Sequence, residues 1–438
     1  LFDDAAAASA RGGFENLQSR NDIDKNAHRN LLRKLLKNCK WPPPYLVKVR
    51  IWNNTTQKPD TCWVPVLLPH EVLHAIMLRS NKQAMCDKDG MSATARRHLE
   101  QVSGLIGTDL LGVGLWLDGT PCNWDRSQSV ETIALNLPGI TGDVGKLRIP
   151  LAALMKRDHL KHHTVDDLLA VMSWSMQNAI AGRFPTHQHD GSPILAKSDR
   201  FRQGKANADL CLRALLVEVR ADWAALKQAF RFPGWRDSSG CCFRCDIAPG
   251  ELRNVSADST WRQPHRRMSH WKLMQRILAK GHGISTLFSM PYFTAEFVAI
   301  DWLHCCDLGV ACDFLGNLFW MLLPHMNGGN QQDRVADLYM RIRVFYGVHK
   351  SESRLDTLTV LMIRKKASTC PKLRAKAGEA RALVPFAREI AEQVLGDHGV
   401  EGSAKQMARH LDECYKCLSK LHFDRTTLEL HSRRFCQQ

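Results

Sequence analysis

The hydrophobic positions between residues 108 and 222 predict strands, a helix and a further strand, in that order. Three apolar runs separated by turns, "LLGVGLWLDG", "SVETIALNLPG" and "KLRIPLAAL", predict three strands. The next run, "TVDDLLAVMSWSMQNAIAG", has apolar residues at helical spacing, opens on the capping residue Thr164 and ends at Gly182. The run "LRALLVEVRAD" then predicts a fourth strand, which ends in the carboxylate of Asp222.

This order of elements predicts an α/β fold built on a mixed sheet. Three strands, a helix and a strand form the order of a ribonuclease-H-like fold, in which the first three strands are an antiparallel meander and the fourth lies parallel to the first. After Asp222 the pattern is irregular and then helical, which predicts a largely helical insertion. Near the N-terminus, "NAHRNLLRKLLKNC" predicts a helix, and "YLVKVRIW" with "TCWVPVLLP" predicts a hairpin.

We therefore divide the chain into four segments. Residues 1–105 form a small N-terminal α+β module, and residues 106–232 form the first part of the ribonuclease-H-like core. Residues 233–370 form a zinc-knuckle and helical insertion, and residues 371–438 supply helices that complete the core and end the chain. The first residues, "LFDDAAAASARGG", are interpreted as a cut or a low-complexity tail.

The net charge of the chain indicates a polyanion as partner, and its cysteine content indicates the cellular compartment. The formal net charge is +16. A chain this basic favours binding to phosphates, because neutralising the phosphates of a polyanion releases the counterions condensed on it. The alternative is a basic protein with a solvated cationic surface. The 15 cysteines follow no regular framework, which suits reduced thiols and an intracellular protein. No apolar run is long enough to span a membrane, so we expect no membrane partner.

Two carboxylates end predicted strands. Asp118 follows the apolar run "GLWL", and Asp222 follows "LLVEVRA". If the two strands are neighbours, these acids meet at one edge of the sheet, where a hard cation such as Mg²⁺ would neutralise them. A two-metal site for phosphoryl transfer needs a third carboxylate. The alternative is that Asp118 is a turn residue and Asp222 a helix N-cap.

Four segments resemble those of CACTA (En/Spm-type) DNA transposases, in the same order along the chain. They are "WLDGTPCNWDRSQSVETIALNL", "VRADWAALKQAFRFPGWRDSSGCCFRC", "IDWLHCCDLGV" and "PKLRAKAGEARALVPF". The resemblance implies a DDE site formed by Asp118, Asp222 and Glu379, with two Mg²⁺ ions. It also implies double-stranded DNA as partner, a nuclear protein of a mobile element, DNA recombination by transposition, and a homodimer on paired DNA ends.

The third acid has rivals on the same predicted helix. Glu379 stands in "KAGEAR", which matches the resembled motif, whereas Glu389 and Glu392 follow at about 15 and 20 Å along the helix axis. Only one of the three can therefore reach the pair of aspartates. We expect Glu379, because the small residues around it leave room for DNA or metals. The alternative is that it is an exposed helix glutamate.

A zinc site is predicted after the second aspartate. Cys242 and Cys245 have the spacing of a zinc knuckle, but a lone pair of this kind needs two further ligands. The resemblance supplies an Asp-x-x-His motif, which here makes His304 the third ligand of one structural Zn²⁺. The fourth ligand stays open, and the candidates for it or for the place of His304 are Asp301, His265 and His270. The alternative is a pair of buried thiols.

Basic and aromatic residues occur together in "FRFPGWR" and "TWRQPHRRMSHWK". Arginine and lysine can neutralise phosphates, and tryptophan can stack on an unpaired base. The predicted DNA-binding residues are Arg231, Arg236, Arg262, Arg266, Arg267 and Lys272, with Trp235, Trp261 and Trp271 as stacking candidates. The tryptophans have a competing role as core anchors.

The function predicted from these features is DNA strand cleavage and transfer by a two-metal DDE site. One alternative is a decayed or domesticated, transposase-derived DNA-binding protein that does no chemistry. Another is a ribonuclease-H-like nuclease that cuts without strand transfer.

Overall fold

The computed structural model describes residues 41–79, 86–123, 127–140, 148–234, 237–238, 240–256, 258–418 and 423–438. These fall into two compact units. One, the sheet unit, comprises Leu1–Phe232 and Ser269–Ala299, and the other, the helical unit, comprises Pro233–Met268 and Ile300–Gln438. The helix predicted from "NAHRNLLRKLLKNC" lies outside the described residues.

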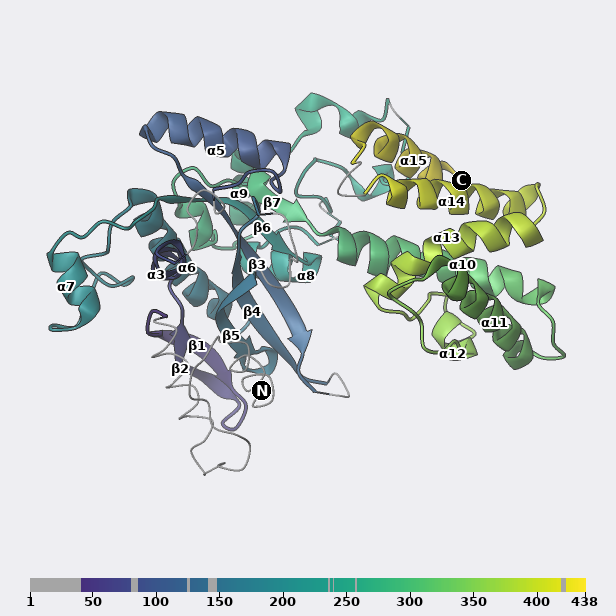
Figure 1. The fold of residues 1–438 in the computed structure, drawn as a ribbon, viewed down its shortest axis with the longest axis horizontal. Coiled ribbons are helices and arrows are strands. Elements are labelled where there is room, and N and C mark those ends of the chain that lie inside the picture. Colours follow the sequence, from purple (N-terminus) through teal and green to yellow (C-terminus); the bar gives the residue numbers. More distant parts are fainter. Residues whose placement is uncertain are drawn as a thin grey trace. The chain divides into compact units, whose positions relative to one another are not determined.

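A five-stranded mixed sheet forms the centre of the sheet unit, in the order β5-β4-β3-β6-β7 (Figure 1). β3 pairs antiparallel with β4, β4 pairs antiparallel with β5, and β6 runs parallel to β3. The predicted α/β class with a mixed sheet is therefore confirmed. The strands are β3 (Leu111–Pro121), β4 (Ser129–Asn136), β5 (Arg148–Met155), β6 (Ala214–Ala221) and β7 (Val298–Ile300).

The two faces of β3 meet different surroundings, because successive side chains of a strand point to opposite sides. Leu117 lines a small space together with Val165 and Leu168 of α6 (His163–Ala181), so this face packs against helices. On the other face, a Cβ added to Gly112 would lie 2.4 Å from Met91 Cε and 3.2 Å from Leu99 Cδ2 of α5 (Ala93–Ile106), so this face also packs against a helix.

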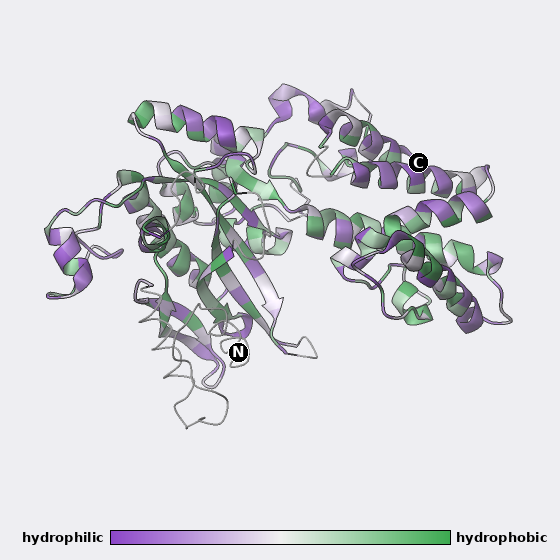
Figure 2. Ribbon diagram, viewed as in Figure 1, coloured by the Kyte–Doolittle hydropathy of each residue, from purple (hydrophilic) through white to green (hydrophobic). Residues whose placement is uncertain are grey.

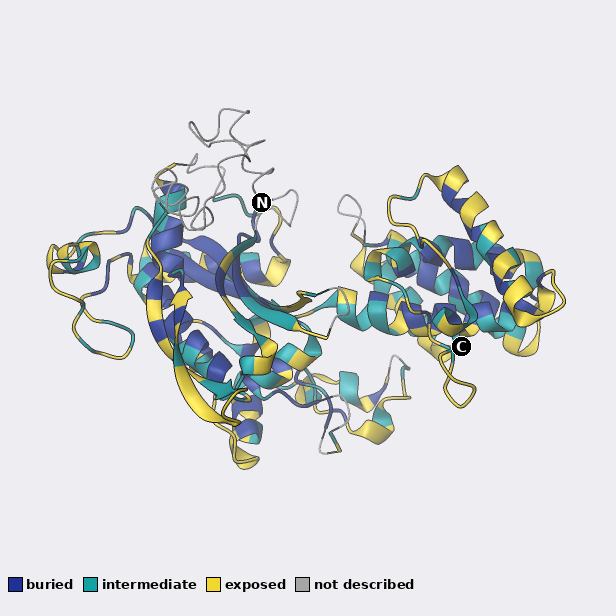
Figure 3. Cartoon of the chain, turned by 90° about the horizontal axis from the view of Figure 1, so that it is seen from below, coloured by how far each residue is buried: buried dark blue, intermediate teal, exposed yellow. Residues whose placement is uncertain are grey.

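Helix α6 joins the sheet to the N-terminal hairpin. The hairpin strands β1 (Tyr45–Asn53) and β2 (Lys58–Val66) pair antiparallel, and α6 packs on β1. Most of β2 is exposed, whereas buried positions dominate β3, β6 and α6 (Figure 3). The remaining helices of this unit are α3 (Pro69–Met77), α7 (Asp199–Lys205), α8 (Trp223–Phe230) and α9 (His270–Ala279).

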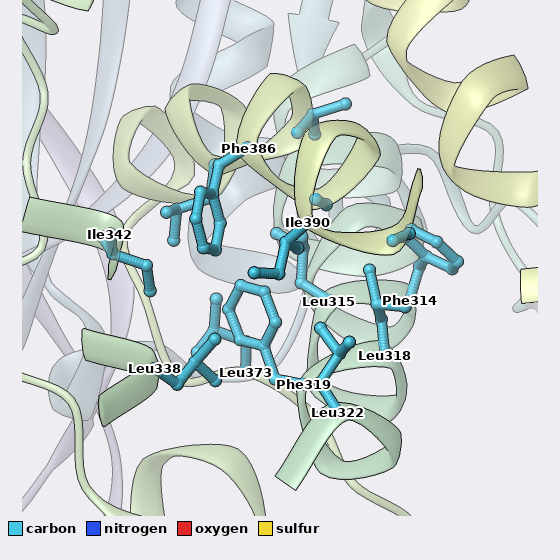
Figure 4. Packing of buried hydrophobic residues seen from close by; sticks show 14 of the residues in the cluster. Phe314, Leu315, Leu318, Phe319, Leu322, Leu338, Ile342, Leu373, Phe386 and Ile390 are labelled. Atoms are coloured by element: carbon cyan, nitrogen blue, oxygen red, sulfur yellow. The ribbon is translucent and has the colours of Figure 1, made fainter. Parts of the chain in front are cut away.

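The helical unit has its own hydrophobic core. Phe319, Leu338, Phe386 and Ile390 pack together within it (Figure 4), while hydrophilic residues cover much of α14 (Figure 2). Its elements are a π-helix (Leu303–Ala311), α10 (Cys312–Leu322), α11 (Gln331–His349), α12 (Val360–Ile363), α13 (Ala377–Val394), α14 (Gly399–Lys416) and α15 (Arg425–Gln437). Short 3₁₀ turns across the two units are Lys156–Asp158, Pro249–Glu251, Thr260–Arg262, Pro264–Arg266, Thr286–Ser289, Ala295–Phe297 and Leu323–His325.

Contrary to the expectation from the sequence, one helical stretch in the described part of the chain, Leu303–His325, is long and apolar enough to cross a membrane. It includes α10, whose Leu315, Leu318 and Phe319 are fully buried in the core of the helical unit. A core helix of this kind has the same composition as a membrane span, so this stretch gives no sign of a membrane partner.

Candidate functional site

Asp118 and Asp222 come from neighbouring parallel strands. The last register pair of β3 with β6 joins Leu117 to Ala221, and each aspartate is the next residue in its chain. Asp222 keeps an extended backbone, with φ −68° and ψ 166°, so it continues the alternation of β6. Because paired strands lie about 4.8 Å apart, this register brings the two acids close together on one face of the sheet.

Asp222 also has a local role. It is the N-cap of α8, and its Oδ1 accepts a hydrogen bond of 2.6 Å from the backbone N–H of Ala225. This is the alternative that the sequence left open for this residue. An N-cap bond engages one carboxylate oxygen, however, and an ionised carboxylate offers about four acceptor positions. Capping and cation binding are therefore compatible at Asp222.

A buried polar group lies on the same face, N-terminal to the two aspartates. Glu218 of β6 is buried, and its Oε1 accepts a 2.8 Å hydrogen bond from Asn136 Nδ2 of β4. Arg220 donates to Glu218 Oε2 at 3.0 Å. Between the two strands stands Gly114, where an added Cβ would lie 2.2 Å from Asn136 Oδ1. The glycine is thus required for Asn136 and Glu218 to meet.

Trp116 lies between this polar group and Asp118, and two arginines approach its ring. The Arg148 guanidinium carbon is 3.4 Å from the ring centroid and that of Arg220 is 5.9 Å away. Both arginines and the tryptophan are half-buried. Sequence reasoning missed this group, although polar residues inside apolar runs, Asn136 in "LNLP" and Arg220 in "VRAD", were a visible signal.

Glu379 belongs to the helical unit and caps its own helix. Its Oε2 accepts a 2.8 Å hydrogen bond from the backbone N–H of Lys376, and its Oε1 lies 3.3 Å from Lys376 Nζ. The side chain is only 13% exposed, so the alternative of an exposed helix glutamate is wrong. Because Asp118 and Asp222 lie in the other unit, convergence of the three acids stays a prediction.

The small residues around Glu379 differ in exposure. Ala380 is fully buried, whereas Gly378 is exposed, although a Cβ added to it would lie 2.8 Å from Ser353 Oγ. That these residues leave space for DNA or metals stays a prediction. Both rival glutamates have partners, since Glu389 lies 3.3 Å from His349 and Glu392 bonds Arg409 at 2.8 Å.

The motif "IDWLHCCDLGV" forms the π-helix, and this geometry is frequent at functional sites. Its Asp307 is buried and accepts hydrogen bonds from Arg381 Nη2 at 2.7 Å and from the Tyr415 hydroxyl at 2.6 Å. Burial, followed by the bond to Asp307, raises the pKa of Tyr415. These bonds tie buried Asp307 to the exposed Arg381 of α13 and to Tyr415 of α14, and they explain Asp307 without a ligand.

Cys242 and Cys245 have the local geometry of a knuckle. The backbone N–H of Arg244 donates to Cys242 Sγ at 3.2 Å, and the N–H of Ile247 makes the equivalent bond to Cys245. Burial and then the neighbouring Cys242 thiol raise the pKa of Cys245 to about 12. The two thiols therefore face each other, rather than lying in separate apolar pockets.

The predicted partners of these thiols are not assembled around them. His304 Nδ1 is hydrogen-bonded to the carboxylate of Asp301, next to it in the same motif. His265 is exposed, and His270 belongs to the sheet unit, where its Nδ1 accepts from Ala295 N–H at 3.2 Å. Across the described residues, the group of three metal-binding side chains within 4.8 Å of one another is His162, His163 and Asp166. His304 therefore does not join the thiol pair, and zinc at the knuckle stays a proposal.

The predicted phosphate-binding residues differ in how available they are. Arg231 is buried, with both guanidinium amino groups bonded to Asp166, so a phosphate contact is not open to it. Arg266 is tied to Glu251 Oε2 at 2.8 Å, and Arg262 to Glu429 Oε1 at 3.1 Å.

The exposed members of the predicted DNA-binding set are Arg267 and Lys272, together with the stacking candidate Trp271. Trp261 donates its Nε1–H to Asn254 O at 2.7 Å. Trp235 and Arg236 lie outside the described residues.

Comparison with known proteins adds no family to this geometry. The chain matches none of the family models searched, and it has no significant match among curated proteins.

Proposed function

We propose that this chain cleaves and transfers DNA strands in the manner of a DDE transposase. The observation that carries the proposal is the register of β3 with β6, which puts Asp118 and Asp222 at matching positions beside each other. The meander β3-β4-β5 and the parallel strand β6 agree with the ribonuclease-H-like core that the resemblance to CACTA transposases implies.

The donor set at the sheet fits Mg²⁺, which prefers carboxylate oxygens. Asp118 and Asp222 would hold the metal and Glu379 would complete the set. Bound Mg²⁺ stabilises the attacking and leaving oxygens of an in-line displacement at phosphate. The attacking hydroxyl is that of water in strand cleavage and that of a DNA 3′ end in strand transfer.

The neighbours of the acids provide a surface for a polyanion. Arg148 and Arg220 lie over Trp116, two positions before Asp118 on the same strand. A guanidinium can bind a phosphate in bidentate fashion, and a tryptophan can stack on an unpaired base. We place the phosphate contacts of the cleaved strand here because both guanidinium groups lie on the strands that carry the acids or next to them, although Arg220 is also bonded to Glu218.

The test is metal-dependent cleavage by the full chain. We expect nicking of supercoiled plasmid in Mg²⁺, and joining of a 3′-hydroxyl oligonucleotide to plasmid, both lost in Asp118→Asn. Asp209→Asn is the control, because Asp209 is an exposed acid of the same unit. Nicking without joining would support a nuclease instead of a transposase.

A second candidate function is DNA binding without catalysis. Two of the three predicted acids, Asp222 and Glu379, already cap helices, so their presence is explained without chemistry. Plasmid binding that is equal in the unmutated protein and in Asp118→Asn, with no cleavage by either, would favour this candidate.

A further inference from the structure

A histidine pair stands at the start of α6, apart from the acids of the proposed active site. His162, and not the predicted Thr164, is the N-cap residue of this helix, and His163 is its first residue. One ring nitrogen of each and one carboxylate oxygen of Asp166 all lie within 4.8 Å of one another. The two rings are 4.4 Å apart, centroid to centroid. The three side chains therefore converge on one point.

The backbone that carries the histidines is fixed on both sides. Thr164 is fully buried, and its hydroxyl accepts from Leu160 N–H at 2.8 Å while donating to Arg50 O at 2.7 Å. Gln228 of α8 donates to Lys161 O at 3.2 Å. The turn before α6 is thus clamped to β1 and α8, which holds the two imidazoles in place before any ligand arrives.

The carboxylate is oriented by a partner behind it. Arg231 follows α8 with φ 57°, a left-handed conformation that non-glycine residues rarely adopt. It donates one amino group to each oxygen of Asp166 and a further bond of 2.9 Å to Ala229 O. Metal-binding carboxylates are commonly held by such outer hydrogen bonds, and Asp166 keeps further lone pairs for a cation.

We propose that His162, His163 and Asp166 bind a divalent transition-metal ion of the zinc type. Two imidazoles and one carboxylate suit zinc, cobalt or nickel better than magnesium, and three protein ligands leave a position for water or a substrate group. Ligand atoms about 2.1 Å from one ion lie at most about 4.2 Å apart, so small side-chain rotations close the site.

Three features oppose a cation here, and none is decisive. The Arg231 guanidinium is bonded to both oxygens of Asp166 and offsets the charge of this carboxylate. The positive end of the helix dipole also disfavours a cation, but by much less than the free energy of micromolar binding. Arg50 Nη1 lies 3.3 Å from His163 Nδ1, but the charge of Arg50 is paired with Asp167 at 2.6 Å. The site does not depend on the proposed cleavage activity.

The test is Co²⁺ titration of the full chain, followed by visible absorption and calorimetry. Cys242 and Cys245 are changed to serine in every sample, because their thiols compete for the ion. We expect one equivalent bound with visible bands and without thiolate charge transfer, and a loss of roughly tenfold or more in affinity in His162→Ala/His163→Ala. Asp166 is left unchanged, because its removal would leave the buried guanidinium of Arg231 without its ion-pair partner.

Two controls keep the result interpretable. His187→Ala removes an exposed histidine elsewhere in the sheet unit and should bind Co²⁺ like the parent. The single change His162→Gln, which disturbs the fold least, should also weaken binding. Equal Co²⁺ affinity in the parent, the double variant and His162→Gln would overturn the proposal, as would a spectrum dominated by thiolate charge transfer.

Discussion

Asp118 and Asp222 each directly follow one member of the last register pair between β3 and β6, Leu117 and Ala221. Parallel strands that pair in this register present their next side chains at one edge of the sheet. The same register places Trp116 opposite Arg220, so acids and base alternate along one face. A polyanion held by the arginines would have its phosphates next to the carboxylates.

The capping role of Asp222 can be separated from a metal-binding role. Serine is as good an N-cap as aspartate but offers no carboxylate. We expect Asp222→Ser to melt like the unmutated protein, and to lose cleavage by at least the roughly 10- to 100-fold that follows damage to the surroundings of a metal ligand. Asp222→Ala should lose cleavage and also about 1 kcal/mol of stability.

Plasmid nicking in Mg²⁺ and thermal unfolding, measured on both variants, check this prediction. Full cleavage by Asp222→Ser would show that the residue is only a cap, and the DDE proposal would then lose its second acid.

Glu379 allows a similar separation. Glutamine can replace glutamate in bonding the N-cap N–H, so Glu379→Gln should preserve the bond to Lys376 and the melting temperature. If Glu379 binds the metal, cleavage disappears while DNA affinity stays within a few-fold, because no phosphate contact is removed.

Glu389→Gln and Glu392→Gln are the matched controls for Glu379, since both lie on α13 with partners of their own. Cleavage and filter binding should be measured on all three variants. Loss of cleavage in Glu389→Gln or Glu392→Gln, but not in Glu379→Gln, would identify a different third acid.

Four strands of the sheet, β3 to β6, were predictable because they are apolar runs bounded by turns, whereas the short β7 lies in the segment expected to be largely helical. "GLWLDG" and "LLVEVRAD" end in carboxylates, so their strand ends were visible, and the meander order made β6 a partner of β3. Which side chains meet across the paired strands was not visible. The bond from Asn136 to Glu218 depends on the register of three strands, and sequence spacing alone does not give that register.

The candidate ligand sets were less predictable than the strands, because they join distant segments. The two thiols of the Cys242 knuckle are close in sequence and face each other, whereas His304 bonds Asp301 and does not lie within ligand distance of them. Arg231 stands in a basic stretch, yet burial and Asp166 give it a structural role. The histidine pair at the start of α6 was overlooked, although "HH" three residues before Asp166 is a spacing that a helix brings together.

Gly114 should tolerate no side chain. Its Cβ would lie 2.2 Å from Asn136 Oδ1 and 2.8 Å from Glu218 Cγ, in a buried, hydrogen-bonded group that cannot shift freely. We expect Gly114→Ala to destabilise the protein by about 1–3 kcal/mol, seen as a lower melting temperature.

The control for Gly114 is Gly104→Ala. Gly104 stands inside α5 with no atom within 4 Å of an added Cβ, so alanine there should stabilise by up to about 1 kcal/mol. A Gly114→Ala protein that melts like Gly104→Ala would mean that the polar group on the sheet face is not packed as described.

Arg148 and Arg220 should contribute to DNA binding through phosphates. Each phosphate contact changes the slope of log affinity against log salt by about 0.7–0.9. We expect Arg148→Ala to lower the magnitude of that slope by this amount, and to weaken binding equally for different DNA sequences, in fluorescence anisotropy titrations at several salt concentrations. Arg202→Ala, an exposed arginine of α7, should leave the slope unchanged; an unchanged slope in Arg148→Ala would place the DNA elsewhere.

The loss of folding stability at acidic pH should depend in part on His70. This residue is buried in α3, with its Nδ1 2.7 Å from Ser175 Oγ, and burial, then the charges of Arg200 and His74, lower its pKa to about 3. An unfolded histidine has a pKa of about 6.5, so between these values the unfolded chain binds a proton that the folded one does not. Stability should therefore fall as the pH drops from about 6.5 towards 3, by up to about 1.4 kcal/mol per pH unit.

In His70→Gln that contribution disappears. The free energy of unfolding, measured with urea between pH 7 and pH 4, should therefore decline less steeply in His70→Gln than in the unmutated protein or in His187→Gln. Parallel curves for all three proteins would mean that His70 is protonated in the folded state or that its environment opens before it titrates.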